Sequence, residues 1–118
     1  METRVTKADL TAPGSTTPIY IGELAQHGLQ FRLDGIVTDL ALKVEASNND
    51  KNDPPDADNE WYNAAEDNEV FTFVADVTDC FRLPGLAANW LRLTFVSFTG
   101  GTPAVRDIQY VGVSQGGR

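Results

Sequence analysis

The sequence contains one cysteine and one histidine, Cys80 and His27, in 118 residues. No intramolecular disulfide can form, and no cluster of histidine and cysteine ligands can hold a transition metal. We expect Cys80 to be a small buried hydrophobe, with an intersubunit bridge or a reactive thiol as the alternatives. We expect His27, which precedes Gly28 between two predicted strands, to face solvent from a turn.

Long hydrophobic runs are also missing, although 42% of the residues are hydrophobic. A bilayer-spanning helix needs about 20 consecutive apolar residues, so no membrane partner is expected. Residues 1–7 lack the apolar core of a signal peptide, which predicts synthesis in the cytoplasm of a host cell.

Basic residues are few: nine lysines and arginines stand against seventeen acids, for a net charge of −8. They are scattered along the chain, whereas neutralising a phosphate backbone requires clustered cations. We therefore expect no nucleic-acid partner, and the same charge opposes binding to anionic lipid.

The residue patterns of common catalytic sites are missing as well. None of the serines (Ser15, Ser47, Ser97 and Ser114) stands in a Gly-x-Ser-x-Gly context, and no glycine-rich phosphate loop is present. With one histidine, a Ser-His-Asp triad has little to be built from. The sequence predicts a protein that is not an enzyme and takes no cofactor.

What the sequence does contain is alternation of apolar and polar residues with a period of two, the pattern of strands with one buried face. It predicts strands over residues 29–33, 40–46 and 90–98, with a returning strand over residues 105–113. Residues 69–77 are apolar on both faces and predict a central strand. The segment Thr99-Gly100-Gly101-Thr102 is typical of a hairpin turn.

Several short strands separated by turn signals predict an all-β fold. We expect an antiparallel β-sandwich that is jelly-roll-like or immunoglobulin-like, with a closed barrel as the alternative. Residues 1–18 are polar and rich in proline, glycine and threonine, which predicts an extended N-terminal arm. The β-sandwich domain is then residues 19–113, and residues 114–118 form a C-terminal tail.

An unusually long acidic loop follows the strand at residues 40–46. Calcium prefers six to eight oxygen ligands, and five carboxylates of the loop are candidates for it. Their spacing does not match an EF-hand, and a solvated acidic loop is the main interpretation. The five are Asp50, Asp53, Asp56, Asp58 and Glu60.

Large apolar side chains outside the predicted core strands are candidates for a partner interface, because aromatic anchors dominate such contacts. The aromatic members are also candidates for a sugar-stacking platform. These candidates are Leu10, Tyr20, Ile21, Trp61 and Tyr62.

The order of several segments supplies a resemblance. Ala46-Ser47-Asn48-Asn49-Asp50 precedes Trp61-Tyr62-Asn63, and a Pro84-Gly85 turn leads to Trp90-Leu91-Arg92-Leu93 and then to Phe98-Thr99-Gly100-Gly101-Thr102. Over residues 28–113 this order resembles small β-sandwich structural proteins of tailed bacteriophages, especially head decoration (cement) proteins. Residues 51–60 depart from that pattern, in which a tight turn leads directly to the tryptophan.

The resemblance implies a virion protein on the exterior of a phage capsid, bound to the major capsid protein and bridging capsid subunits as a homo-oligomer. It leaves two alternatives open: a tail or neck component, and a carbohydrate-binding adhesin module.

Overall fold

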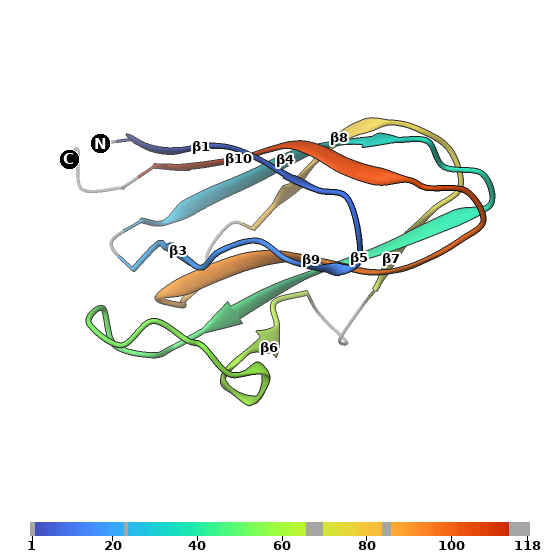
Figure 1. Cartoon of the computed structure of the whole chain (residues 1–118). Helices are drawn as coiled ribbons and strands as arrows, with labels where there is room; N and C mark the ends of the chain where they lie inside the picture. Colours follow the sequence, from blue (N-terminus) through green and yellow to red (C-terminus); the bar gives the residue numbers. More distant parts are fainter. Residues whose placement is uncertain (1, 23, 66–69, 84–85, 114–118) are drawn as a thin grey trace.

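The computed structural model describes residues 2–22, 24–65, 70–83 and 86–113. Two β-sheets pack face to face, with Glu2 and Val113, the first and last described residues, at one end of the molecule (Figure 1). The described residues include no helix of the length and hydrophobicity needed to cross a membrane. The elements are β1 (Glu2–Leu10), β2 (Gly14–Ser15), β3 (Ile19–Tyr20), β4 (Gln26–Asp34), β5 (Asp39–Ser47), the short 3-10 helix η1 (Asp58–Glu60), β6 (Tyr62–Asn63), β7 (Phe71–Phe73), β8 (Thr78–Arg82), β9 (Trp90–Thr99) and β10 (Ala104–Val113).

The order of the strands decides between the predicted sandwich types. The first sheet has the order β1-β10-β4-β8; the second has the order β2-β9-β5-β6, with β3 also pairing with β9 and β7 with β5. All pairs are antiparallel. When β2 and β3 count as one interrupted strand, and β6 and β7 as another, this is the order of a jelly roll. The predicted antiparallel β-sandwich is confirmed, in its jelly-roll form.

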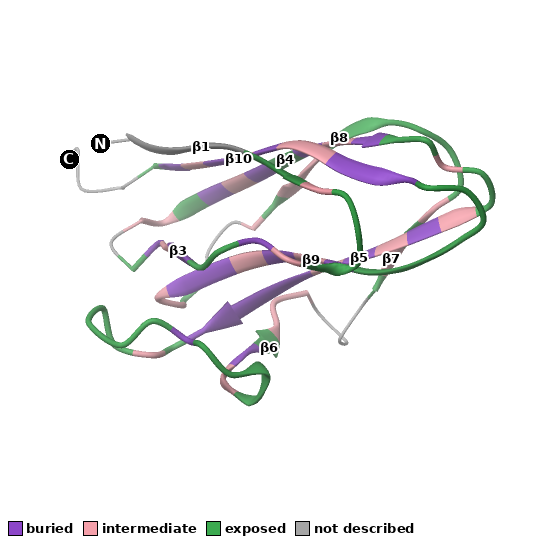
Figure 2. Ribbon diagram, in the orientation of Figure 1, coloured by how far each residue is buried: buried purple, intermediate pink, exposed green. Residues whose placement is uncertain are grey.

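The core lies between the sheets and is built from the alternation seen in the sequence. On β4 and β5, every second residue along the apolar face is buried, while its neighbours on the strand are polar or more exposed (Figure 2). The two central strands of each sheet supply most of the core: Leu29, Phe31 and Leu33 from β4, Val105, Ile108 and Tyr110 from β10, Leu40, Leu42, Val44 and Ala46 from β5, and Leu91, Leu93 and Phe95 from β9.

The structure corrects the prediction of an extended N-terminal arm. Residues 2–10 form β1, which pairs with β10 from Glu2–Val113 to Leu10–Val105, and β2 pairs with β9 in the other sheet. Asp9 also accepts a hydrogen bond from the backbone N–H of Asp107 at 2.9 Å. The segment looked like a linker because an edge strand needs few large apolar side chains and tolerates charge.

The run over residues 69–77 is not a central strand. Only Phe71–Phe73 is strand, at the edge of the second sheet, and β8 begins in the other sheet at Thr78. Between them Val74 is 74% exposed, so its apolar side chain marks a connection and not the core. Glu69 lies outside the described residues, as does the predicted Pro84-Gly85 turn.

The paired glycines also differ from the prediction. Gly100 and Gly101 adopt φ values of 76° and 67°, the left-handed conformation that glycine accepts without strain. The turn nevertheless joins β9 in the second sheet to β10 in the first, so it forms no hairpin. The prediction had the backbone conformation right and the pairing wrong.

Three connections between the sheets meet at the end of the sandwich away from the chain ends, which we call the crossover end (residues 35–38, 74–77 and 100–103) (Figure 1). The Asp76 carboxylate accepts hydrogen bonds from the backbone N–H groups of Gly35 at 3.2 Å and Ile36 at 2.8 Å. Gly101 packs so closely on Val37 that a Cβ there would meet its side chain at 2.5 Å. These contacts hold the three connections together.

His27 is a buried core residue, which corrects the expectation of a solvent-facing turn. It lies on β4 and is 5% exposed, and a hydrogen bond of 2.6 Å joins its Nδ1 to the Tyr110 hydroxyl. Burial lowers the pKa of His27 below its ordinary value of 6.5 and raises the pKa of Tyr110. At neutral pH the core therefore holds a neutral imidazole beside a protonated phenol.

Acidification is expected to destabilise the fold through His27. Its pKa of 6.5 in the unfolded chain is higher than in the folded one, so the unfolded state binds the proton first and stability falls as the pH drops below 6.5. Urea denaturation at about pH 7.5, 6.5 and 5.5 should show this loss. His27→Gln, which cannot titrate, should show a flatter profile; equal slopes in both proteins would contradict the assignment.

Candidate functional site

The outer face of the second sheet carries a polar hollow that we call the sheet cleft. Its floor follows from strand alternation: on β5 the side chains of Lys43 and Glu45 point opposite to the core residues Leu42 and Val44. The cleft has a volume of about 680 Å³ and lies between β2 on one side and η1 with β6 on the other. Its polar lining includes Ser15, Lys43, Glu45, Asp58, Asn63 and Arg92.

Glu45 is the centre of this floor, and it is only 6% exposed. Its Oε1 accepts hydrogen bonds from Arg92 Nε at 2.8 Å and from the Thr94 hydroxyl at 2.6 Å, and its Oε2 lies 3.4 Å from Lys43 Nζ. Burial by itself raises the pKa of Glu45, but the bonds from Thr94 and Arg92 outweigh it and hold this pKa below its usual value. The carboxylate is therefore ionised and fixed in place.

The same network ties β2 to the sheet. The Thr94 hydroxyl gives its one proton to Glu45, so the Ser15 hydroxyl, 2.8 Å away, donates to Thr94. Four side chains from β2, β5 and β9 thus form a continuous set of hydrogen bonds: Ser15, Thr94, Glu45 and Arg92.

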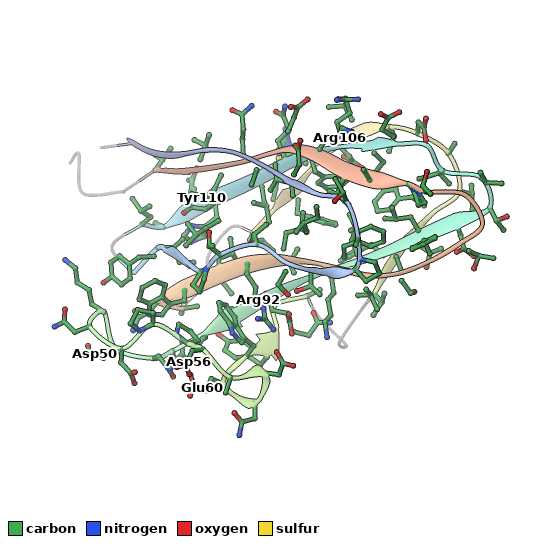
Figure 3. The ribbon with its side chains drawn as sticks, viewed as in Figure 1. Asp50, Asp56, Glu60, Arg92, Arg106 and Tyr110 are labelled. Atoms are coloured by element: carbon green, nitrogen blue, oxygen red, sulfur yellow. The ribbon has the colours of Figure 1, made fainter. Side chains whose placement is uncertain are left out.

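Arg92 also forms the inner wall of the cleft. Its guanidinium carbon lies 4.4 Å from the centre of the Trp61 ring, a cation–π contact, and its NH2 group lies 3.5 Å from the Asp58 carboxylate. Trp61 is 8% exposed, and its buried indole N–H has no hydrogen-bond partner among the described residues. Arg92 therefore attaches the segment around η1 to the sheet (Figure 3).

The acidic loop before η1 is folded by hydrogen bonds. The indole N–H of Trp90 donates to the carbonyls of Asn49 at 3.1 Å and Asp50 at 3.2 Å. Glu60 accepts from the Asn49 side chain at 2.9 Å and from the backbone N–H of Asp56 at 3.1 Å. The loop is thus closed on itself at Glu60 and anchored to the sheet at Trp90.

These bonds bear on the calcium alternative. Glu60 is used within the loop and Asp58 faces Arg92, while Asp50 and Asp56 point in different directions (Figure 3). Within the ranges that the structure describes, no three His, Cys, Asp or Glu side chains gather as a metal site. The loop carboxylates, Asp53 included, do not form a calcium cage there.

The candidate interface residues separate into two groups. Ile21 is fully buried and Leu10 packs against the core, while Trp61 is covered by the cleft wall, so none of these three offers a broad surface to a partner. Tyr20 is half-buried, edge-on to Trp90 at 5.3 Å. Tyr62 on β6 is 42% exposed, so it remains available for contact.

Two polar features escaped the sequence-based prediction. In the sequence, Arg92 and Glu45 have the pattern of ordinary outward-facing residues on two strands. They come together only because β5 pairs with β9, which places Glu45 opposite Arg92. His27 had a usable signal, because the alternation of Leu29 and Phe31 extends back to position 27. Cys80 proves to be half-buried on β8, beside Gly28.

Comparison with known proteins yields similarity of fold. No family model matches the sequence, and no curated protein matches it. The crystal structure of the SPBc2 prophage-derived protein YomS is similar, with a TM-score of 0.58 and 16% identity over 97% of this chain and 94% of that one. The chain shares its fold with a phage-derived protein.

A second structure, of infectious bursal disease virus strain Gx, matches with a TM-score of 0.43 and 10% identity over 98% of this chain and 32% of that one. That similarity is too low to establish a shared fold.

Glu45→Ala is expected to destabilise the protein by about 3 kcal/mol, because it leaves the Arg92 guanidinium without its buried partner. Asp58→Ala, which removes the fully exposed partner of the same arginine, should leave the denaturation midpoint unchanged. Chemical denaturation of the two variants and the wild type measures both effects. Equal effects of the two substitutions would contradict the central role of Glu45.

Proposed function

We propose that this chain is a structural protein of a phage particle, a decoration or cement protein that binds the major capsid protein on the outside of the head and bridges its subunits. The observation that carries the proposal is the match of nearly the whole chain, 97% of its residues, to nearly the whole of a prophage-derived protein.

Three further features support a binding role. Jelly rolls are common in viral capsid and lectin domains. The net charge of −8 suits a position outside a DNA-filled shell and opposes contact with the DNA inside it. The order of segments in the sequence resembles that of phage head decoration proteins.

The crossover end is the attachment surface that we propose in place of the N-terminal arm. Val37 is 68% exposed and Val74 is 74% exposed there, and Val77 is also an exposed large apolar residue. Phe98, near the end of β9, is a further exposed apolar residue beside this end. Exposed apolar side chains on a surface held by its own hydrogen bonds lose little entropy when a partner covers them. A homo-oligomer of such units would add avidity on a repetitive shell.

The location in the particle tests this proposal. Cryo-electron microscopy of particles from the phage or prophage that encodes the chain should show a jelly-roll density on the outer surface of the head. Density on the tail or neck, density inside the shell, or the absence of the protein from purified particles would each contradict the decoration role.

The attachment surface has its own test. Val74→Asp should bind particles that lack the wild-type protein about tenfold more weakly or worse, because it places charge in the contact. The Val74 side chain is 74% exposed, so the melting temperature of the variant should stay close to that of the wild type. Val113→Asp, an exposed valine on the last described residue of β10, is the matched control and should bind normally. Equal binding by all three proteins would exclude the crossover end.

A further inference from the structure

The sheet cleft has a composition that sets it apart from the rest of the acidic chain. Two cations, Lys43 and Arg92, and two anions, Glu45 and Asp58, line it, so their charges sum to zero although the chain carries −8. A ligand with a large net charge would therefore gain little in this cleft. A neutral ligand with both donors and acceptors would find partners for both.

The cleft also retains hydrogen-bonding capacity after its internal network is complete. The Lys43 ammonium has three donors and the Arg92 guanidinium has five, more than their contacts with Glu45 and Asp58 use. The Asp58 side chain is fully exposed at the rim and presents acceptor oxygens to solvent. These groups are held by the Glu45 network, so they are oriented before a ligand arrives.

A third observation concerns Trp61. Trp61 lines the cleft, is 8% exposed, and carries a buried indole N–H without a partner among the described residues. Buried polar groups in proteins are nearly always hydrogen-bonded, so such a donor at a cleft calls for an acceptor.

From these observations we propose that the sheet cleft binds a neutral saccharide. A sugar presents several hydroxyl groups, each a donor and an acceptor, without net charge. The sheet cleft has a volume of about 680 Å³, which is within the usual range for small-ligand sites and is large enough for a sugar. In this assignment Asp58 accepts from sugar hydroxyls, Lys43 and Arg92 donate to them, and Glu45 positions both cations.

This site differs from an exposed aromatic platform, because one face of the Trp61 ring is covered by Arg92. It also lies on the outer face of the second sheet, whereas the proposed capsid contact lies at the crossover end. The inference does not depend on attachment to a capsid, and each can fail without the other.

Two-dimensional NMR of the isolated, isotope-labelled chain tests the site directly. The probes are glucose, galactose, N-acetylglucosamine, lactose and maltose, with N-acetylneuraminic acid and inorganic phosphate as anionic probes. At least one neutral sugar should shift the Trp61 indole signal and the Arg92 Nε–H signal saturably. Trp90 is the internal control: its indole N–H is already bonded to Asn49 and Asp50, so its signal should stay in place.

A pair of matched variants completes the test. Asp58→Asn should weaken binding of the best sugar about tenfold, the usual effect of losing a charged hydrogen bond. Asp53→Asn makes the same change in the same loop at an exposed position that does not line the cleft, and should bind like the wild type. No shift with any neutral sugar, shifts by the anionic probes alone, or equal loss in both variants would overturn the proposal.

Discussion

The constraint on which this structure depends is the burial of one face of each sheet against the other. Four strands, β4 and β10 in one sheet and β5 and β9 in the other, place their large apolar side chains in the shared core. Because a strand turns successive side chains to opposite faces, fixing the inner set also fixes the outer one. The register that buries Leu42 and Val44 therefore puts Glu45 on the opposite face of the sheet, opposite Arg92 on β9. The cleft is a consequence of how the core packs.

The same reasoning explains which parts of the fold could be predicted from the sequence. Central strands such as β5 bury a regular apolar face, so apolar and polar residues alternate clearly along them. This alternation predicts their positions well. Edge strands show a weaker alternation because less of their surface is covered. Among the described strands, β1 pairs with β10 alone, and β7, which is short and partly covered, lies at the edge beside β5. For that reason the predictions over residues 2–10 and 70–77 are wrong. The glycine pair at positions 100 and 101 shows a second limit, since local conformation does not say which sheet the next strand joins.

The candidate site was less predictable still. Its parts come from β2, β5, β9 and the segment around η1, which lie far apart in the sequence. Each residue is unremarkable where it stands, because arginine, glutamate and threonine on an outward strand face usually meet only water. What makes them a site is a buried ionic contact, costly to desolvate unless its partners are complete. The Glu45 network meets that condition with bonds from Arg92 and Thr94 and a contact with Lys43.

The pairing of β1 with β10 has a consequence for how the protein is made. Glu2 lies opposite Val113, and β10 stands between β1 and β4 in the first sheet. Of the strands described, β1 is translated first, and β10, the strand between it and β4, is translated last. The first sheet can therefore close only after all of these strands are present, and such long-range pairing is a slow step in folding. Until then, the apolar side chains of β4 and β5 lack part of their cover, and such exposed surface makes a partly folded chain prone to aggregation.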